Sequence, residues 1–309
     1  MIRSLVVIAL PALLLTAQVN AAVRQPAKHI AVSTQHTGWM SRSANPTHAW
    51  LYVNGNPDLI EIYDLDAFGI PKIGSITTGV DNPECMTLDA KGNLYLANFN
   101  GSVVMYPPGA TSPSVTLTQG LPGPFCVAVD GHGNLWVNNN SPNPSILIFA
   151  PGQMQPFETI TGSLIQSPTD SFFDPAGNYY FADDLTGLNE IPSGSFQPVS
   201  AGLHELTSAS GATMTNDGAI FAANFSGQGR KILVYRRGKL DPEQRTVDFS
   251  GNADYMTHGT VKRIDYVFLP NRFSNTVSVF KVRATEPTVV FQTDISGTNG
   301  VAYKAKGVP

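Results

Sequence analysis

The 309-residue sequence predicts an all-β protein, a β-propeller of six blades with four antiparallel strands in each blade. Three observations lead to this prediction. A short motif recurs about every 41 residues, each repeat contains four apolar segments of strand length, and the chain is rich in turn residues but poor in charge. Four short strands per unit and a period of this length are typical of propeller blades, which pack side by side in a ring.

The composition excludes several other classes of protein. With 42% hydrophobic residues the chain is not disordered, and with 14% charged residues it is not a coiled coil or a helical array. The 28 glycines and 23 prolines indicate many turns. The formal net charge of −4 argues against nucleic-acid binding, because contacts with phosphates need a basic surface.

The N-terminus has the pattern of a secretory signal peptide. Arg3 provides the positive charge, residues 5–15 form a largely apolar run, and Val19-Asn20-Ala21 offers small residues to a signal peptidase. A membrane anchor is the alternative, but it needs about 20 apolar residues, and this run is shorter. We therefore predict cleavage near Ala21, a linker over residues 22–37, a propeller over residues 38–309, and a secreted or periplasmic protein without a membrane span.

The repeat consists of a Gly-Asn turn with an apolar strand on either side. Its clearest copy, at residues 91–98, reads Lys-Gly-Asn-Leu-Tyr-Leu-Ala-Asn. The other copies lie at residues 49–53, 132–139, 176–183, 217–224 and 265–269. A first strand such as residues 85–89 precedes the turn, and a third strand such as residues 103–106 and a variable fourth strand such as residues 114–117 follow it. The middle strands are apolar on both faces, as expected for sheets packed between two neighbours.

Two alternatives to a closed ring of six blades exist. A solenoid of similar period needs polar capping repeats, which the sequence lacks. A seventh blade is also conceivable, because residues 28–33 can begin another strand. The first-strand pattern occurs once more at residues 299–303, so we expect the C-terminal strand to complete the blade that begins at the N-terminus and thereby close the ring.

The repeat unit resembles a known family. The pattern Pro-x-small-apolar-x-apolar-Asp-x-x-Gly-Asn-Leu-Tyr, found from about residue 40 to residue 305, is similar to the NHL repeat and to propellers of the SMP-30/gluconolactonase group. That group includes lactonases, lyases and interaction platforms, so the resemblance implies a fold more than an activity. It also implies metal ligands where several first strands begin. At those positions this chain has Glu84, Phe125, Thr169, Ser210, Thr257 and Asn299. Glu84 and Asn299 are the candidate ligands, with Asp170 one residue further on.

A polar residue follows the second strand of most repeats. These residues are Asn98, Asn139, Asp183, Asn224 and Asn271, with Gly55 at the first position. One hypothesis is a polar crown at a propeller mouth that binds a ligand or a hard cation such as calcium. The favoured alternative is that each side chain hydrogen-bonds the backbone of its own turn, because the residue recurs in blade after blade.

The remaining reactive residues are few. Cys85 and Cys126 occupy equivalent positions in adjacent repeats, where either a disulfide or two free buried thiols are possible; we favour free thiols because equivalent side chains point the same way around a ring. Tyr255 and His258 are a candidate acid–base pair near an inner strand, although a structural pair is favoured.

These observations favour a binding module over an enzyme. We predict a monomeric, secreted, NHL-like propeller that binds a protein, peptide or glycan through a mouth or the central channel. The alternative is a lactonase- or lyase-type enzyme with Glu84, Asp170, Tyr255, His258 and Asn299 as candidate site residues. No cofactor is expected, and a divalent cation such as calcium is the open possibility.

Overall fold

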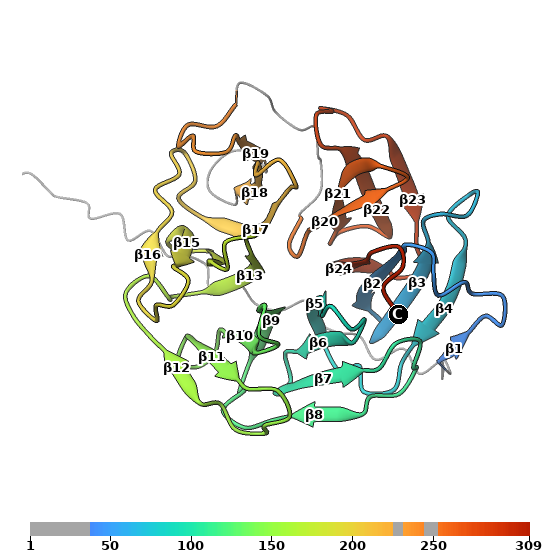
Figure 1. Cartoon of the computed structure of the whole chain (residues 1–309), viewed down its shortest axis with the longest axis horizontal. Coiled ribbons are helices and arrows are strands. Elements are labelled where there is room, and N and C mark those ends of the chain that lie inside the picture. Colours follow the sequence, from blue (N-terminus) through green and yellow to red (C-terminus); the bar gives the residue numbers. More distant parts are fainter. Residues whose placement is uncertain (1–37, 225–230, 244–252) are drawn as a thin grey trace, which may run out of the picture.

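The computed structural model describes residues 38–224, 231–243 and 253–309. The predicted signal peptide and linker, and the possible strand at residues 28–33, lie outside these residues. All regular secondary structure in the described part is β-strand, arranged as six antiparallel sheets in a ring (Figure 1). The predicted six-bladed propeller is therefore confirmed. The described part contains no helix long and apolar enough to cross a membrane.

The blades follow one another in chain order. Blade 1 comprises β1 (Trp39–Met40), β2 (Trp50–Asn56), β3 (Leu59–Asp64), β4 (Lys72–Ile76) and the last strand, β24 (Gly297–Lys304). Blade 2 comprises β5 (Pro83–Leu88), β6 (Leu94–Asn98), β7 (Ser102–Tyr106) and β8 (Val115–Leu117). Blade 3 comprises β9 (Pro124–Val129), β10 (Leu135–Asn139), β11 (Ser145–Phe149) and β12 (Glu158–Ile160).

The second half of the ring has the same plan. Blade 4 comprises β13 (Pro168–Phe173), β14 (Tyr179–Asp183), β15 (Gly187–Ile191) and β16 (Val199–Ser200). Blade 5 comprises, among the described residues, β17 (Ala209–Met214), β18 (Ile220–Asn224) and β19 (Lys231–Tyr235). Blade 6 comprises β20 (Thr257–Val261), β21 (Ile264–Asn271), β22 (Thr276–Lys281) and β23 (Val289–Gln292). The inner strands β24, β5, β9, β13, β17 and β20 lie next to one another in this order around the channel.

The recurring Asp-x-x-Gly-Asn sequence builds the turn between the first two strands. In blade 2, Asp89 Oδ1 accepts hydrogen bonds from the amides of Lys91 and Asn93, both at 2.9 Å, and Asn93 Nδ2 donates to Asp89 Oδ2 at 2.7 Å. Gly92 has a φ of 80°, a conformation that favours glycine. The motif repeats regularly because its aspartate and asparagine form the hydrogen bonds of the turn and its glycine adopts the positive φ that the turn needs.

Apolar side chains pack mainly between the blades. Six of the buried clusters each join two neighbouring sheets, for example Ala97 and Val103 of blade 2 with Val127 of blade 3. A seventh, smaller cluster lies at the channel and contains Cys85, Phe125, Cys126 and Tyr255. The hydrophobic core is therefore ring-shaped, and only a small part of it faces the centre.

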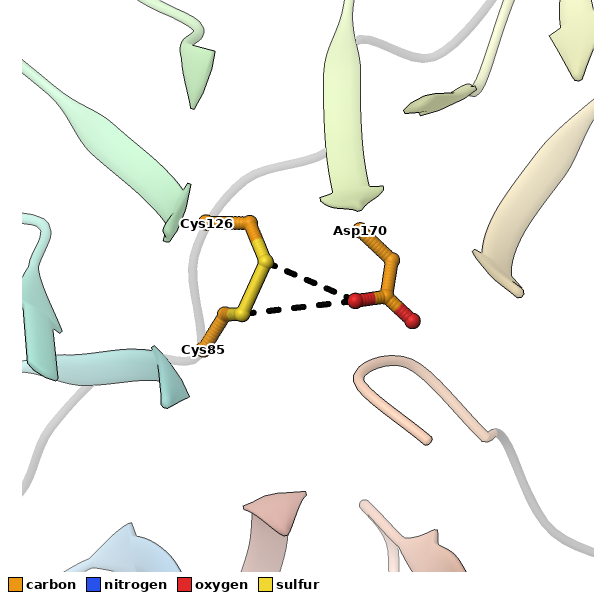
Figure 2. Close-up of side chains that lie close together, drawn as sticks. All are labelled: Cys85, Cys126 and Asp170. Carbon is orange, nitrogen blue, oxygen red and sulfur yellow. Dashed lines mark hydrogen bonds between the residues drawn. A yellow bond between two sulfur atoms is a disulfide. The ribbon is translucent and has the colours of Figure 1, made fainter. Parts of the chain in front are cut away.

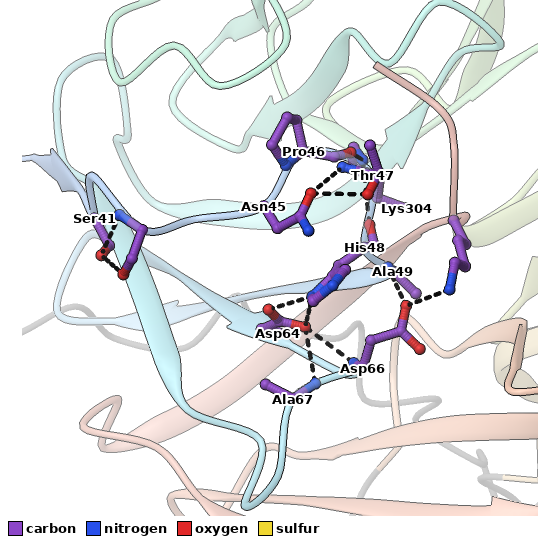
Figure 3. Close-up of polar contacts among 12 residues, drawn as sticks. Ser41, Asn45, Pro46, Thr47, His48, Ala49, Asp64, Asp66, Ala67 and Lys304 are labelled. Carbon is purple, nitrogen blue, oxygen red and sulfur yellow. Dashed lines mark hydrogen bonds and ion pairs between the residues drawn. The ribbon is translucent and has the colours of Figure 1, made fainter.

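The C-terminal strand closes the ring, as predicted. β24 pairs antiparallel with β2 over its whole length and forms the inner strand of blade 1. Lys304, which is 1% exposed, lies over the ring of Trp50 at 4.5 Å and donates to the carbonyl oxygens of Pro46 and His48 (Figure 3). His48 also pairs with Asp64 at the end of β3. The first and last described segments thus hold each other in place.

Candidate functional site

The inner strands of blades 2 to 5 each bring one equivalent position to the central channel. The inner strands of blades 2 to 5 have the same register, because Pro83, Pro124, Pro168 and Ala209 each pair with the last residue of the second strand. The residues two positions further on are Cys85, Cys126, Asp170 and Gly211. Three adjacent blades therefore present two cysteines and one aspartate to the centre.

The two cysteines form a disulfide (Figure 2), so the expectation of free thiols is wrong. The Cα atoms of Cys85 and Cys126 are 4.6 Å apart, well within the range for a disulfide. Equivalent positions do point the same way relative to their own blades. At the channel, however, β5 and β9 converge, so the same direction leads both side chains into one small space.

Asp170 lies beside this disulfide (Figure 2) and is buried, with 3% of its surface exposed. Its carboxylate accepts hydrogen bonds from the backbone amides of Ser171 at 2.9 Å and Ala212 at 3.0 Å, and also from the amide of Met256. Burial raises the pKa of Asp170 well above its usual range, and the three amides act in the opposite direction. The carboxylate therefore links blades 4 and 5 and the segment before β20.

A second polar cluster contains three of the predicted site residues. Glu84 is 0% exposed, and its Oε2 atom accepts hydrogen bonds from the Tyr255 hydroxyl and from Asn299 Nδ2, both at 2.8 Å. Asn54 Nδ2 donates to the Glu84 carbonyl at 2.6 Å. In this arrangement Asn299 offers a donor to the carboxylate, which fits a structural network better than a cation site. Metal binding by Glu84 and Asn299 stays a prediction.

Tyr255 reaches this cluster because residues 253–256 enter the channel. Asp254 is 0% exposed and pairs with Arg272 at 2.7 Å, and Tyr255 forms a parallel bridge with Gly300 of β24. Space for this segment comes from Gly211, where an added Cβ would lie 1.7 Å from the Asp254 carbonyl oxygen. Blade 5 thus has Gly211 where blades 2 to 4 have a larger side chain, and the backbone of residues 253–256 fills that part of the channel.

His258 lies apart from the central clusters. Its Nε2 atom is 4.0 Å from Asp265 Oδ1, within blade 6. Burial lowers the pKa of His258, and the charges of Asp265 and Asp217 act in the opposite direction. The structure thus pairs Tyr255 with Glu84 and places His258 beside Asp265. A role for Tyr255 and His258 as an acid–base pair stays a prediction.

The residues of the predicted polar crown bond mainly to nearby backbone. Asn98 Oδ1 accepts from the Asp81 amide, Asn139 Oδ1 from the Gly123 amide, and Asp183 from the amides of Gln166, Ser167, Leu185 and Thr186. Asn224 donates to the Glu205 carbonyl, and Asn271 accepts from the Phe273 amide. Most of these backbone partners lie 16 to 19 residues earlier, before the first strand of the same blade, so bonding within the residue's own turn is seen only in part, as for Asp183 with Leu185 and Thr186. Ligand binding by the crown stays a prediction.

A cavity of about 210 Å³ opens from the channel on the side of the Gly-Asn turns. Its floor contains Cys85, Asp170 and Tyr255, all buried. Its wall carries hydroxyl groups and aromatic rings from the ends of the inner strands. The wall residues include Thr87, Ser171, Phe172, Phe173, Thr213 and Thr257. Two larger hollows, of about 450 and 530 Å³, flank Arg236 and Arg237 at the edge of blade 5. We regard the channel cavity as the candidate site because buried polar groups converge only there among the described hollows.

The disulfide allows a direct prediction about stability. It closes a loop of 41 residues and joins blades 2 and 3 at the channel. Thiol titration of the denatured protein should find no free thiol before reduction and two after it. Because reduction frees the unfolded chain, we expect the free energy of unfolding to fall by roughly 2–4 kcal/mol, measured by urea denaturation. A thiol count of two without reductant would contradict the disulfide.

Comparison with known proteins supports the fold and nothing finer. No family model matches the chain, and no curated protein sequence matches it. Among solved structures, a chain in the crystal structure of a nidogen/laminin complex superposes with a TM-score of 0.70 at 12% identity, covering 82% of this chain and 98% of that one. The dihydro-heme d1 dehydrogenase NirN gives a TM-score of 0.51 at 15% identity and 86% coverage of this chain. The Kuenenia stuttgartiensis hydrazine synthase gives 0.53 at 16% identity and 65% coverage. This chain spans 58% and 63% of the lengths of the last two.

Proposed function

We propose that this protein is an exported, monomeric interaction module that binds a protein, peptide or glycan at the channel cavity. The observation that carries the proposal is the cavity itself, whose floor and wall come from the inner strands of several blades. Export is supported by the N-terminal sequence and by the disulfide, since disulfides persist in oxidising compartments. The similar propeller in the nidogen/laminin complex comes from a protein assembly, which is consistent with a binding role.

The lining of the cavity favours an uncharged polar group as the part of the partner that enters. Thr87, Thr213 and Thr257 offer hydroxyl groups. Phe172 and Phe173 also border the cavity, but their rings pack against Tyr180 and Trp136. Asp170 contributes the one carboxylate, and its oxygens already accept backbone hydrogen bonds. A volume of about 210 Å³ is below the usual range for drug-sized ligands. One sugar ring or one amino-acid side chain is therefore the expected occupant.

Glu84 supports this choice over catalysis. A catalytic group must reach the reacting atoms, yet Glu84 has no exposed surface and accepts hydrogen bonds from Tyr255 and Asn299. The alternative, a lactonase-type enzyme, draws on the fact that these three residues do gather at the channel. Metal analysis of the purified protein and a panel of lactones and esters separate the two functions. Bound metal and hydrolysis that are both lost in Glu84→Ala would favour the enzyme.

A matched pair of variants tests the binding proposal. Binders are selected against the wild-type protein from a displayed peptide library and a glycan array, and their affinities are then measured for two variants. Thr87→Arg places a bulky charge at the cavity, and Thr116→Arg places the same group on the exposed outer strand of the same blade. We expect Thr87→Arg to weaken binding at least about tenfold and Thr116→Arg to leave it unchanged. Binders that tolerate both variants equally would disprove the site.

A further inference from the structure

Three potential metal ligands meet at the floor of the channel cavity. Asp170 Oδ1 lies 3.4 Å from Cys126 Sγ and 4.0 Å from Cys85 Sγ (Figure 2). All three ligand atoms lie within 4.8 Å of one another and belong to buried residues. They come from β5, β9 and β13, three adjacent inner strands, so the blades themselves fix their spacing.

The carboxylate holds this position independently of the sulfur atoms. Amides of Ser171 and Ala212 hold its two oxygens, and these amides belong to inner strands of blades 4 and 5. A sulfur atom in a disulfide carries no hydrogen, so the two dashed lines in Figure 2 become hydrogen bonds only when the cysteines are thiols. In the oxidised protein the sulfur atoms therefore offer the buried carboxylate no donor, although burying a carboxylate is costly.

Two thiolates and one carboxylate are a suitable ligand set for zinc. Zn²⁺ prefers four ligands in a tetrahedron, drawn from cysteine sulfur, histidine nitrogen and carboxylate oxygen. We propose that reduction of the Cys85–Cys126 disulfide by a dithiol converts this group into a Zn²⁺ site, with Cys85, Cys126 and Asp170 as ligands. Cys85 and Asp170 both line the cavity, so a water molecule there supplies the fourth ligand.

The proposed conversion balances chemically. The S–S bond breaks, the dithiol gives up two electrons and two protons, and it leaves as a disulfide while Cys85 and Cys126 become thiols. Zn²⁺ then displaces both thiol protons, because thiolate is the form that binds metal. The oxidised protein cannot bind in this way, since its sulfur atoms are bonded to each other. Metal binding is therefore controlled by the redox state of one pair of cysteines.

Cobalt provides a spectroscopic test on the full-length exported protein. The disulfide is reduced with a water-soluble phosphine, which is oxidised to its phosphine oxide, and the excess is removed under nitrogen before titration with Co²⁺. We expect one Co²⁺ per chain, with a thiolate-to-cobalt charge-transfer band and the visible bands of tetrahedral Co²⁺. Zn²⁺ should displace the cobalt and raise the melting temperature of the reduced protein.

Three matched samples make the result decisive. Unreduced protein and the Cys85→Ser/Cys126→Ser double variant should give no band. Asp170→Asn keeps both thiols but loses the charged ligand, so we expect its affinity for Zn²⁺ to fall at least about tenfold. A reduced wild-type protein that keeps its circular dichroism spectrum and two titratable thiols but shows no band would overturn the proposal. Reduced protein that unfolds and is not restored by Zn²⁺, or equal affinity in Asp170→Asn, would overturn it as well.

Discussion

Deletion of residues 297–309 should abolish cooperative thermal unfolding. The deletion removes β24, which is the inner strand of blade 1 and pairs with β2 along its whole length. It also removes Val301 and Ala302, each 2% exposed, and Lys304, which binds carbonyl oxygens of the N-terminal segment. Differential scanning calorimetry should show no single transition for the truncated protein, whereas the full chain should show one.

The physical reason is that β24 covers the inner edge of β2 and completes the ring of inner strands. Without β24 the inner edge of β2 loses its partner, and β5 loses a neighbour on the other side of the seam. Exposed strand edges pair with other chains, so we expect light scattering from the truncated protein to rise on warming. A propeller that tolerates this loss would have to be held together by blades 2 to 6 alone.

A shorter deletion is the control. Removal of residues 305–309 keeps all of β24 and takes away only the tail after it, including Lys306, whose ammonium group is 3.9 Å from Asp66 Oδ2. The Lys306 side chain is 68% exposed and its distance to Asp66 is long, so this pair contributes little. The shorter protein should therefore unfold cooperatively with a melting temperature within a few degrees of the full chain. Equal melting of both truncated proteins would show that β24 does not close the ring.

The fold could be predicted from the sequence because the residues that determine it interact over a few positions along the chain and recur in successive repeats. Asp89, Gly92 and Asn93 each satisfy a requirement of one turn, and the same solution recurs in other blades. The C-terminal closing strand was predictable for the same reason, since residues 299–303 repeat the pattern of a first strand. The same repetition predicted that the crown residues bond to backbone, but Asn98 and Asn139 accept hydrogen bonds from amides 17 and 16 residues earlier, before the first strand, and not only within their own turns.

The candidate site was less predictable because it depends on contacts between distant segments. Glu84 and Tyr255 are 171 residues apart, and no local pattern brings them together. The disulfide could not be predicted from the repeat, because equivalent positions give the direction of each cysteine side chain but not the convergence of the inner strands at the channel. A signal did exist for Asp170. The repeat alignment places Cys85, Cys126 and Asp170 at one position in three successive blades, where blade 5 carries Gly211.

Replacement of Glu84 should have the largest effect of any single substitution at the channel. Glu84→Ala removes the acceptor for the Tyr255 hydroxyl and for Asn299 Nδ2, which keeps its second hydrogen bond to the Pro83 carbonyl. Each lost buried hydrogen bond to a carboxylate costs about 1.5–3 kcal/mol, and the vacated space adds to this cost. We therefore expect the free energy of unfolding, measured by equilibrium urea denaturation, to fall by about 3–5 kcal/mol.

Glu84→Gln is the matched variant that separates the effect of side-chain size from the effect of negative charge. Glutamine keeps the size of the side chain and a carbonyl oxygen that can accept from Tyr255 and Asn299. If the network is structural, this variant should lose only about 1–2 kcal/mol. A loss as large as that of Glu84→Ala would mean that the negative charge itself is required, as expected if the carboxylate holds a cation.

A double-mutant cycle then measures how much of this stability comes from the hydrogen bond between Tyr255 and Glu84. Tyr255→Phe removes only the hydroxyl group that donates to Glu84 Oε2 at 2.8 Å. In the wild-type background this change should destabilise the protein by about 1–2 kcal/mol, whereas in the Glu84→Ala background it should cost much less, because the acceptor is already absent. Additive effects in the cycle would show that the two residues are not coupled. A coupling of about 1 kcal/mol or more would mean that blade 2 and the segment before β20 hold each other through this one buried hydrogen bond.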